Sequence, residues 1–369
     1  MKILLLPNSL KGSLSARQTA RVLQQALGKK HSLKSFPLSD GGDGFIDFFA
    51  ALYPAARRIP LQAQNAFGKK ASTSYLWLAK QKTAVLETAQ ICGLGSAKKT
   101  ELNPLGASSF GVGEVILHAL KKGAKKIYIG LGGVACNDGG AGIAQALGAC
   151  FLDKYGQKIS GGAQPLLQVK KIETTALQNH LRNVKIYAVA DVKNPLLGKQ
   201  GSARVYGPQK GATAAQVRIL EKALSTYAQV VKRTTGKNIA TTPGTAAAGG
   251  LCAGLYGLCQ AQIIFGADFL QTHLPLDKWA AWADWIITSE GKLDTQTLYG
   301  KAPLAALQVA AKTHKPVLFI CGQYDKKILR KLPRGLKLQI ACLSDFANDL
   351  PDAQQQAPRY ITRLSKNLF

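Results

Sequence analysis

The sequence predicts an α/β fold in two domains, and three observations support this. The chain has 369 residues, which is more than one typical domain contains. Short apolar runs alternate with segments of helical pattern, an order typical of α/β proteins with a largely parallel sheet. The apolar runs are continuous rather than alternating, as expected for strands that are buried on both faces.

The expected elements follow one another along the chain. Ser15 and Gln18, three residues apart, form a capping-box pattern at the start of the first helix. The helices are expected at residues 15–27, 108–120 and 141–147, and the strands at 3–6, 83–86, 126–129, 185–190, 285–288 and 316–320. Polar, glycine-rich loops follow these strands, and in open α/β sheets ligands bind outside the carboxyl ends of strands.

Composition indicates a soluble globular protein, with 46% hydrophobic and 18% charged residues. Forty-eight basic residues against 20 acidic ones give a net charge of +28, which favours anionic partners such as nucleotides, anionic metabolites or nucleic acid. The lysines lie in scattered pairs and form no basic stripe interleaved with aromatic residues. We therefore expect a lysine-rich surface and no specific nucleic-acid partner.

The seven cysteines form no CxxC pair and are odd in number, so reduced thiols in the cytosol fit better than a disulfide framework or a zinc site. The N-terminal apolar run is shorter than a signal-peptide core. No stretch approaches the roughly 20 apolar residues that a membrane span needs. We expect a cytoplasmic protein without a membrane partner.

The first candidate loop is NSLKGS, residues 8–13. Gly12 allows close backbone approach, and amides at a helix start attract anions. Lys11 adds a positive charge, while Ser9 and Ser13 offer hydroxyl groups. The loop predicts a phosphate or substrate site, although a plain turn would look the same, and it is not a Walker A sequence.

The second candidate loop is SDGGDG, residues 39–44. Gly41 and Gly42 expose backbone amides, while Asp40 and Asp43 could hold Mg²⁺ or substrate hydroxyls. A simple acidic turn is the alternative.

The third candidate loop is GLGGVACNDGGAG, residues 130–142, between an expected strand and an expected helix. Its opening matches the alanine form of the dinucleotide fingerprint only weakly, because the loop continues before any helix begins. We interpret it as an anion and polar-ligand loop. The candidate binding residues are Gly132, Gly133, Asn137, Asp138, Gly139 and Gly140.

The remaining candidates lie in the second half of the chain. Asp191 ends the strand at 185–190 and is placed as a general base beside Asn194. Lys210, in GPQKGAT, offers another contact to an anion. The segment TSEGKLDTQTLYGKAP contributes Glu290, Asp294 and Lys301, a mixture of carboxylates and lysine that suits a metal-phosphate site. A helix is expected to begin at Thr295 or Thr297.

Taken in this order, the loops resemble those of the bacterial type I glycerate kinase family. The resembling segments are PNSLKGSLSA, DGGDGF, NPLGASSFGVGE, GLGGVACNDGGAG, DVKNPL, YGPQKGAT, GTAAAGGL and SEGKLDTQTLYGKAP. They keep the family's order from residue 1 to about 325.

The resemblance implies ATP-dependent phosphorylation of D-glycerate with Mg²⁺, with 2-phosphoglycerate as the favoured product. It also implies a flavodoxin/Rossmann-like domain built from both chain ends, residues 1–65 and 286–369. A second α/β domain, residues 66–285, would be inserted, with the active site in the cleft between the two.

Phosphoryl transfer then assigns roles to the candidates. Lys11, Lys210 and Lys301 would neutralise charge, and Asp191 would accept the proton of the glycerate hydroxyl, with Asp294 as the second choice. Asp43 or Glu290 would hold Mg²⁺.

Four positions depart from the family pattern. It has acidic residues where this chain has Asn8 and Lys193, and small hydroxyl residues where this chain has Val134 and Cys136. Asn8 cannot ionise, and Lys193 adds positive charge near Asp191. They leave open a kinase for another small hydroxy acid, or a catalytically impaired homologue that binds polyanions. The oligomeric state stays open, with a homodimer among the options.

Overall fold

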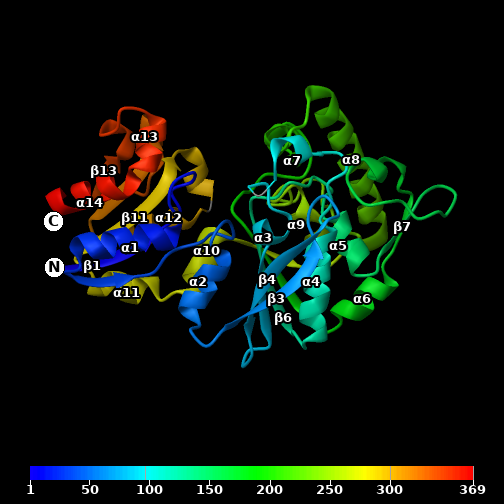
Figure 1. Cartoon of the computed structure of the whole chain (residues 1–369), viewed down its shortest axis with the longest axis horizontal. Coiled ribbons are helices and arrows are strands. Elements are labelled where there is room, and N and C mark those ends of the chain that lie inside the picture. Colours follow the sequence, from blue (N-terminus) through cyan, green and yellow to red (C-terminus); the bar gives the residue numbers. More distant parts are fainter. Residues whose placement is uncertain (96, 300, 369) are drawn as a thin grey trace. The chain divides into compact units, whose positions relative to one another are not determined.

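The computed structural model describes residues 1–95, 97–299 and 301–368. The chain divides into two units, shown in Figure 1. The first consists of Met1–Ala51 with Phe265–Phe369, and the second of Leu52–Ile264. The predicted α/β unit made from both chain ends, with a second α/β unit inserted, is therefore confirmed.

The first unit is built on a five-stranded sheet in the order β13-β12-β11-β1-β2. Its strands are β1 (Lys2–Pro7), β2 (Ser32–Ser35), β11 (Trp285–Leu293), β12 (Val317–Tyr324) and β13 (Leu338–Cys342). All neighbouring pairs are parallel. The side chains of residues 3–6 and 317–320 are fully buried, as predicted for strands covered on both faces. Numbered along the unit, the strand order is 2-1-3-4-5, which is the flavodoxin-like order.

Helices cover this sheet. They are α1 (Ala16–Leu27), α2 (Phe45–Leu52), α10 (Gly266–His273), α11 (Leu276–Trp282), α12 (Ala302–Lys312), α13 (Leu350–Gln355) and α14 (Ala357–Leu368). Ile3 and Leu5 point to the face where α1 and α14 pack together, while α12 packs against β1 and β11. The predicted capping box begins α1, with Ser15 Oγ accepting from Gln18 N at 3.2 Å.

The second unit is built on a six-stranded sheet in the order β10-β9-β6-β5-β4-β3. Its strands are β3 (Arg57–Gln64), β4 (Lys70–Leu78), β5 (Thr83–Glu87), β6 (Lys126–Leu131), β9 (Lys185–Ala190) and β10 (Gln262–Phe265). The β5–β6 and β6–β9 pairs are parallel, whereas β3, β4 and β5 pair antiparallel. A separate antiparallel pair joins β7 (Cys150–Leu152) to β8 (Lys171–Glu173).

The helices of the second unit range from one turn to 22 residues. They are α3 (Ala89–Cys92), α4 (Phe110–Lys121), α5 (Ala141–Ala146), α6 (Thr175–Leu181), α7 (Ser202–Tyr206), α8 (Ala214–Thr235) and α9 (Leu251–Gly257). Throughout the described part of the chain, no helix is both long enough and apolar enough to cross a membrane.

The structure differs from the sequence-based expectations around residue 290. β11 was expected to end at 288 but continues to Leu293, because its backbone keeps pairing with β12 through Lys292 and Gln323. Glu290 therefore lies in a strand and not in a loop. Thr295 begins only a short 3₁₀ helix, and α12 begins at Ala302, where Pro303 suits the first helical turn.

The unit boundaries also lie elsewhere than at 65 and 285. β3 falls in the first 65 residues but pairs with β4, which places it in the second unit. α10 and α11 precede residue 286 but pack against α12, which places them in the first unit. β3 is an edge strand of the sheet and β4 is its antiparallel neighbour. Both strands mix polar and apolar residues, and the continuous apolar runs used for prediction could not reveal them.

Candidate active site

In the first unit, the carboxyl ends of β1 and β11 meet where the strand order of the sheet reverses. β1 lies between β2 and β11, and all three strands are parallel. In sheets of this order, ligands bind outside the carboxyl ends of the strands at this point. The loop after β1 and Glu290 of β11 both lie at this edge.

The loop after β1 is held against β11 by backbone contacts. Asn8 is buried. Its backbone amide donates to the backbone carbonyl of Ser289 at 3.2 Å, and Ser289 Oγ donates to the backbone carbonyl of Asn8 at 2.8 Å. A Cβ atom at Gly291 would lie 2.9 Å from the Lys11 amide nitrogen, so only glycine allows this approach. Gly12 has a φ of +81°, which favours glycine in the turn.

The predicted polar side chains of this loop differ in availability. Lys11 is exposed and Ser9 is half-buried. Ser13 Oγ donates its proton to the Gln354 carbonyl at 2.5 Å, which leaves only oxygen lone pairs for a ligand. Lys11 is therefore the exposed charged group that this loop offers to an anion.

Beside this loop lies a group of charged and polar residues, called here the Lys301 cluster: Asp40, Glu290, Thr297, Lys301 and the amide of Ala302. Asp40, Glu290 and Thr297 are buried, and Lys301 is half-buried. Lys301 Nζ donates to Glu290 Oε1 at 2.7 Å, and Thr297 Oγ1 donates to Glu290 Oε2 at 2.7 Å. The Ala302 amide, at the start of α12, donates to Asp40 Oδ2 at 3.1 Å. The cluster joins Asp40 to residues 290–302, which are far away in the sequence.

Burial raises the pKa of Glu290, and the negative charge of Asp40 adds to this. The charge of Lys301 and the hydrogen bonds from Lys301 and Thr297 act in the opposite direction. The cluster contains two carboxyl groups against one ammonium group. When both carboxyl groups are ionised it carries surplus negative charge, which a cation would neutralise.

A divalent cation would find few ligands here from the protein alone. Within residues 1–95, 97–299 and 301–368, no three His, Cys, Asp or Glu side chains lie close enough to hold a metal. Both oxygens of Glu290 already accept hydrogen bonds, Asp43 is exposed and Asp294 is half-buried. Magnesium usually binds one or two carboxylates together with substrate phosphates and water, and the cluster could supply that share.

In the second unit, the third candidate loop leaves β6 and is anchored by Thr88. Thr88 Oγ1 donates to the Gly130 carbonyl at 3.0 Å and accepts from the Gly132 amide at 3.3 Å. The Leu94 amide donates to the Gly133 carbonyl at 2.6 Å. Gly132 is half-buried and Gly133 exposed, so both are accessible to a ligand.

Asp138 serves the loop itself. Its Oδ2 accepts from Ser109 N at 2.7 Å, Ser109 Oγ at 2.9 Å, Gly142 N at 3.2 Å and Ser108 Oγ at 3.4 Å. Its Oδ1 accepts from Gly140 N at 3.1 Å. The carboxylate is fully buried and its acceptor positions are occupied, so Asp138 shapes the site by joining the loop to the start of α4.

Gly139 and Gly140 also serve packing. A Cβ atom at Gly139 would lie 2.9 Å from the ring of Tyr227, and one at Gly140 would lie 2.7 Å from the Leu251 carbonyl. Both have positive φ. These two glycines let α8 and α9 approach the loop closely, whereas we had expected their amides to face a ligand.

Asn137 and Lys210 carry unused hydrogen-bonding capacity in the interior. Asn137 is fully buried, and among the described residues neither atom of its carboxamide has a partner. Lys210 Nζ donates to the Cys136 carbonyl at 2.6 Å, next to Asn137 in the chain. Burial lowers the pKa of Lys210 from 10.5. Unsatisfied buried groups are costly, and an anionic ligand would accept hydrogen bonds from the NH₂ group of Asn137 and from the Lys210 ammonium.

Asp191 leaves the sheet at the same edge. Leu131 of β6 pairs with Ala190 of β9, so the third loop and Asp191 follow neighbouring parallel strands. Burial, and secondly the charge of Asp191, raise the pKa of Tyr206 to about 12. The side chain of Asn194 donates to the Gln200 carbonyl at 2.8 Å and accepts from Tyr206 at 3.4 Å, so it holds the turn.

Sequence reasoning had not singled out four residues that shape these loops: Thr88, Ser108, Ser109 and Gly249. A Cβ atom at Gly249 would lie 2.0 Å from the Cys136 carbonyl and 2.5 Å from Lys210 Nζ. The serine pair at the start of the helix expected at 108–120 was a local signal, because serine is favoured at helix starts. Nothing local indicated the contacts of Thr88 or Gly249, which link distant segments.

Comparison with known proteins identifies the family. The glycerate kinase family model matches residues 3–369. The chain is 35% identical to a glycerate 2-kinase of Escherichia coli K12, covering 100% of this chain and 97% of that protein. It is 32% identical to a glycerate kinase of Halalkalibacterium halodurans, covering 99% and 97%. A crystal structure of a proposed glycerate kinase 2 from Salmonella typhimurium LT2 is similar, with a TM-score of 0.80, 34% identity and coverage of 100% and 97%. The chain belongs to the glycerate kinase family.

Proposed function

We propose that this protein transfers the γ-phosphoryl group of ATP to the 2-hydroxyl of D-glycerate, giving 2-phosphoglycerate and ADP. Family membership supports the kinase reaction, and the relative named glycerate 2-kinase supports the position. The observation that carries the proposal is the pair Asn137 and Lys210. Its buried amide and ammonium have capacity for an anion where the parallel strands of the second unit end.

The protein groups divide between charge neutralisation and proton transfer. Lys210 and Asn137 bind an anionic group of ATP or glycerate in a site with little water, where such contacts are strong. Lys11, which is exposed, binds a further anionic group. Asp191 accepts the proton of the glycerate 2-hydroxyl. The hydroxyl oxygen bonds to the γ-phosphorus, and the bond from this phosphorus to ADP breaks. Asp294 is the second candidate for this base.

We propose that Mg²⁺ binds together with ATP. When bound, it would supply positive charge that neutralises the phosphates. Glu290 and Asp40 of the Lys301 cluster, with Asp43 at the exposed end of its loop, are the carboxylates that could contribute ligands.

Asn8 bears on the choice of substrate. Its backbone fastens the loop to Ser289 in both directions, a role that does not need a carboxylate. We expect the loop to keep its shape with asparagine, and D-glycerate to remain the substrate. A different small hydroxy acid is the alternative that Asn8 and Lys193 raise.

Turnover identifies the reaction. Purified protein with ATP, Mg²⁺ and D-glycerate should release ADP, and the ³¹P NMR spectrum should show 2-phosphoglycerate. A 3-phosphoglycerate signal would contradict the assigned position. Turnover with another hydroxy acid but not with D-glycerate would contradict the substrate, and Asn8→Asp would then show whether this residue sets the preference.

The cysteines and the net charge bear on where the protein acts. The seven cysteines are free thiols, as expected in the cytosol, where we place the protein. If the charge of +28 served polyanion binding, duplex DNA would bind strongly at physiological salt and compete with the anionic substrates. We expect turnover to be unaffected by DNA at physiological salt.

A further inference from the structure

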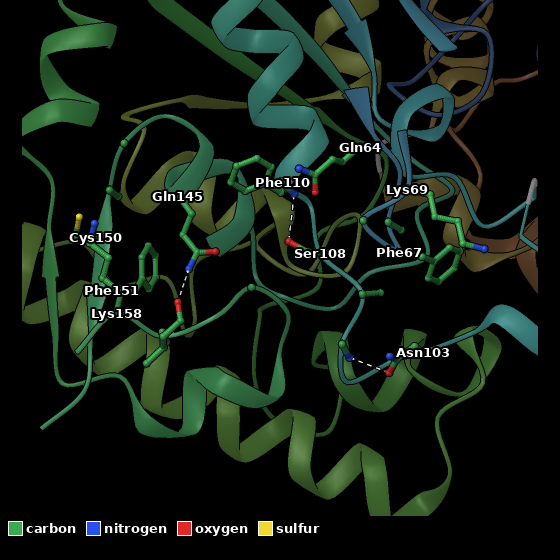
Figure 2. Close-up of a pocket in the computed structure, with 18 of the residues that line it drawn as sticks. Gln64, Phe67, Lys69, Asn103, Ser108, Phe110, Gln145, Cys150, Phe151 and Lys158 are labelled. Carbon is green, nitrogen blue, oxygen red and sulfur yellow. Dashed lines mark hydrogen bonds between the residues drawn. The ribbon is translucent and has the colours of Figure 1, made fainter. Parts of the chain in front are cut away.

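A pocket of about 850 Å³ lies in the second unit, and none of the proposed catalytic residues lines it (Figure 2). Its walls come from the end of β3, the turn into β4, residues 101–108, the start of α4, the end of α5, and β7. Its volume is in the range of small-molecule sites.

The pocket lies at the carboxyl edge of the second sheet. β3 is antiparallel to β4, and β4 is antiparallel to β5, so β3 and β5 run in the same direction. The end of β3, where Gln64 lines the pocket, is therefore at the edge where β5 and β6 also end. Ligands of open α/β sheets bind at this edge.

Ser108 connects the pocket to the third candidate loop. It lines the pocket, and its Oγ donates to Asp138 Oδ2 at 3.4 Å. Ser108 Oγ also accepts from the backbone amide of Phe110 at 3.2 Å, at the start of α4. A molecule in the pocket is thus separated by one residue from the loop that carries Asn137.

The lining offers aromatic rings and unused amides. Phe67 and Phe110 are half-buried at the wall. In the described part of the chain, nothing hydrogen-bonds the carboxamide of Gln64. Asn103 Oδ1 accepts from the Gly106 amide at 2.9 Å, which leaves its NH₂ group available. A carboxamide matches the adjacent hydrogen-bond donor and acceptor on an edge of adenine, and aromatic side chains stack on the face of the base.

The charges of the lining do not suit a triphosphate. Lys69 is paired with Glu101 at 3.0 Å, which leaves one surplus positive charge, on the exposed Lys158. A nucleotide tail carries several negative charges and would be poorly neutralised. A neutral, flat and polar group fits these surroundings better.

We propose that this pocket is the nucleoside subsite for ATP, with the phosphates leaving it past Ser108 toward Asn137. The inference rests on the proposed function, since it assigns the base and ribose of that reaction's nucleotide. Phe67 and Phe110 provide stacking surfaces, and Gln64 and Asn103 provide hydrogen bonds to the purine.

Nucleotide binding by the full chain tests this directly, without catalysis. A fluorescent ADP analogue is bound to wild-type protein and displaced with ADP, adenosine or tripolyphosphate. Phe67→Ala should raise the dissociation constants of ADP and adenosine by roughly 5- to 100-fold, the usual loss of base stacking. It should leave that of tripolyphosphate unchanged. Equal weakening of all three ligands, or of none, would overturn the assignment.

Two neighbouring glutamines provide a matched pair of variants. Gln64→Leu removes a pocket carboxamide, whereas Gln62→Leu removes one from the same strand that is exposed and bonded to Ser72 at 2.7 Å. Only Gln64→Leu should raise the KM for ATP, with the KM for D-glycerate unchanged. Equal effects of the two variants would contradict the proposal.

Filling the pocket provides an independent check. A Cβ atom at Gly161 would lie 3.3 Å from Ser108 Oγ, so Gly161→Leu places a side chain in this wall. It should prevent adenosine binding, and circular dichroism confirms that the variant is folded. Unchanged adenosine binding in folded Gly161→Leu would overturn the subsite. If the wild type binds adenosine but does not phosphorylate glycerate, and Gly161→Leu loses adenosine binding, the subsite would be supported and the proposed function contradicted.

Discussion

Asp191 is the residue on which the proposed chemistry depends most. Asp191→Asn keeps the shape of the side chain but cannot accept the substrate proton. We expect kcat to fall by about 10²- to 10⁴-fold, the usual contribution of a general base, with the KM for ATP little changed. Steady-state kinetics measures this, and Asp294→Asn provides the comparison. If Asp294→Asn loses turnover and Asp191→Asn does not, the base is Asp294.

Lys210 should reveal its burial through the pH dependence of stability. Because burial lowers its pKa from 10.5, the unfolded chain binds a proton that the folded protein lacks between the lowered value and 10.5. The contribution of Lys210 to the free energy of unfolding therefore rises with pH through this window, and is lost as pH falls through the lowered pKa.

Lys210→Met removes this contribution. Urea unfolding at pH 7 and pH 10 should show that the wild type gains stability relative to the variant as pH rises. Lys222→Met, at an exposed lysine of α8, controls for the loss of a positive charge. The same difference between wild type and Lys210→Met at both pH values would refute a lowered pKa in the folded state.

At the scale of elements, Gly249 holds the segment before α9 against the third loop. Gly249→Ala places a methyl group on the Cys136 carbonyl and the Lys210 ammonium, and adds left-handed strain at a φ of +66°. Gly236, at the end of α8, has a φ of +75° in open space, so Gly236→Ala carries the strain alone, about 1–2 kcal/mol. We expect Gly249→Ala to lower the unfolding free energy well beyond Gly236→Ala and to impair ATP turnover. Denaturant unfolding measures both variants. Equal losses of unfolding free energy in Gly249→Ala and Gly236→Ala would mean that the segment before α9 moves to accommodate the methyl group at no cost.

Elements with strong local patterns were predicted well, and elements without them were missed. The capping box at Ser15 and the continuous apolar run of β1 are local signals, and both were confirmed. β11 continues through polar residues because its ladder is made by backbone groups, which the pattern of side chains does not report. The β3–β4 hairpin was missed for a related reason, since antiparallel strands near the edge of a sheet mix polar and apolar residues instead of forming a continuous apolar run.

At the scale of the whole molecule, the two units should differ in their ability to fold alone. Residues 52–264 contain a six-stranded sheet with its own helices, so we expect this fragment to show cooperative thermal unfolding by circular dichroism. Residues 1–51 should not fold alone, because β1 lacks its partner β11. A structured 1–51 fragment, or an unfolded 52–264 fragment, would show that the units are not the folding units.

Local patterns in this chain were enough to specify the α/β alternation, most of the strands that end at ligand loops, and the family. They are enough because strand burial, helix capping and glycine-rich turns depend on residues close together in sequence. The tertiary structure decided which loop residues are available to a ligand. Asp138 and Gly139 are occupied by packing and hydrogen bonds, whereas Asn137 and Lys210 are left with unused capacity. That distinction depends on partners such as Ser109, Tyr227 and Gly249, which are far away in the chain, so no local pattern could contain it.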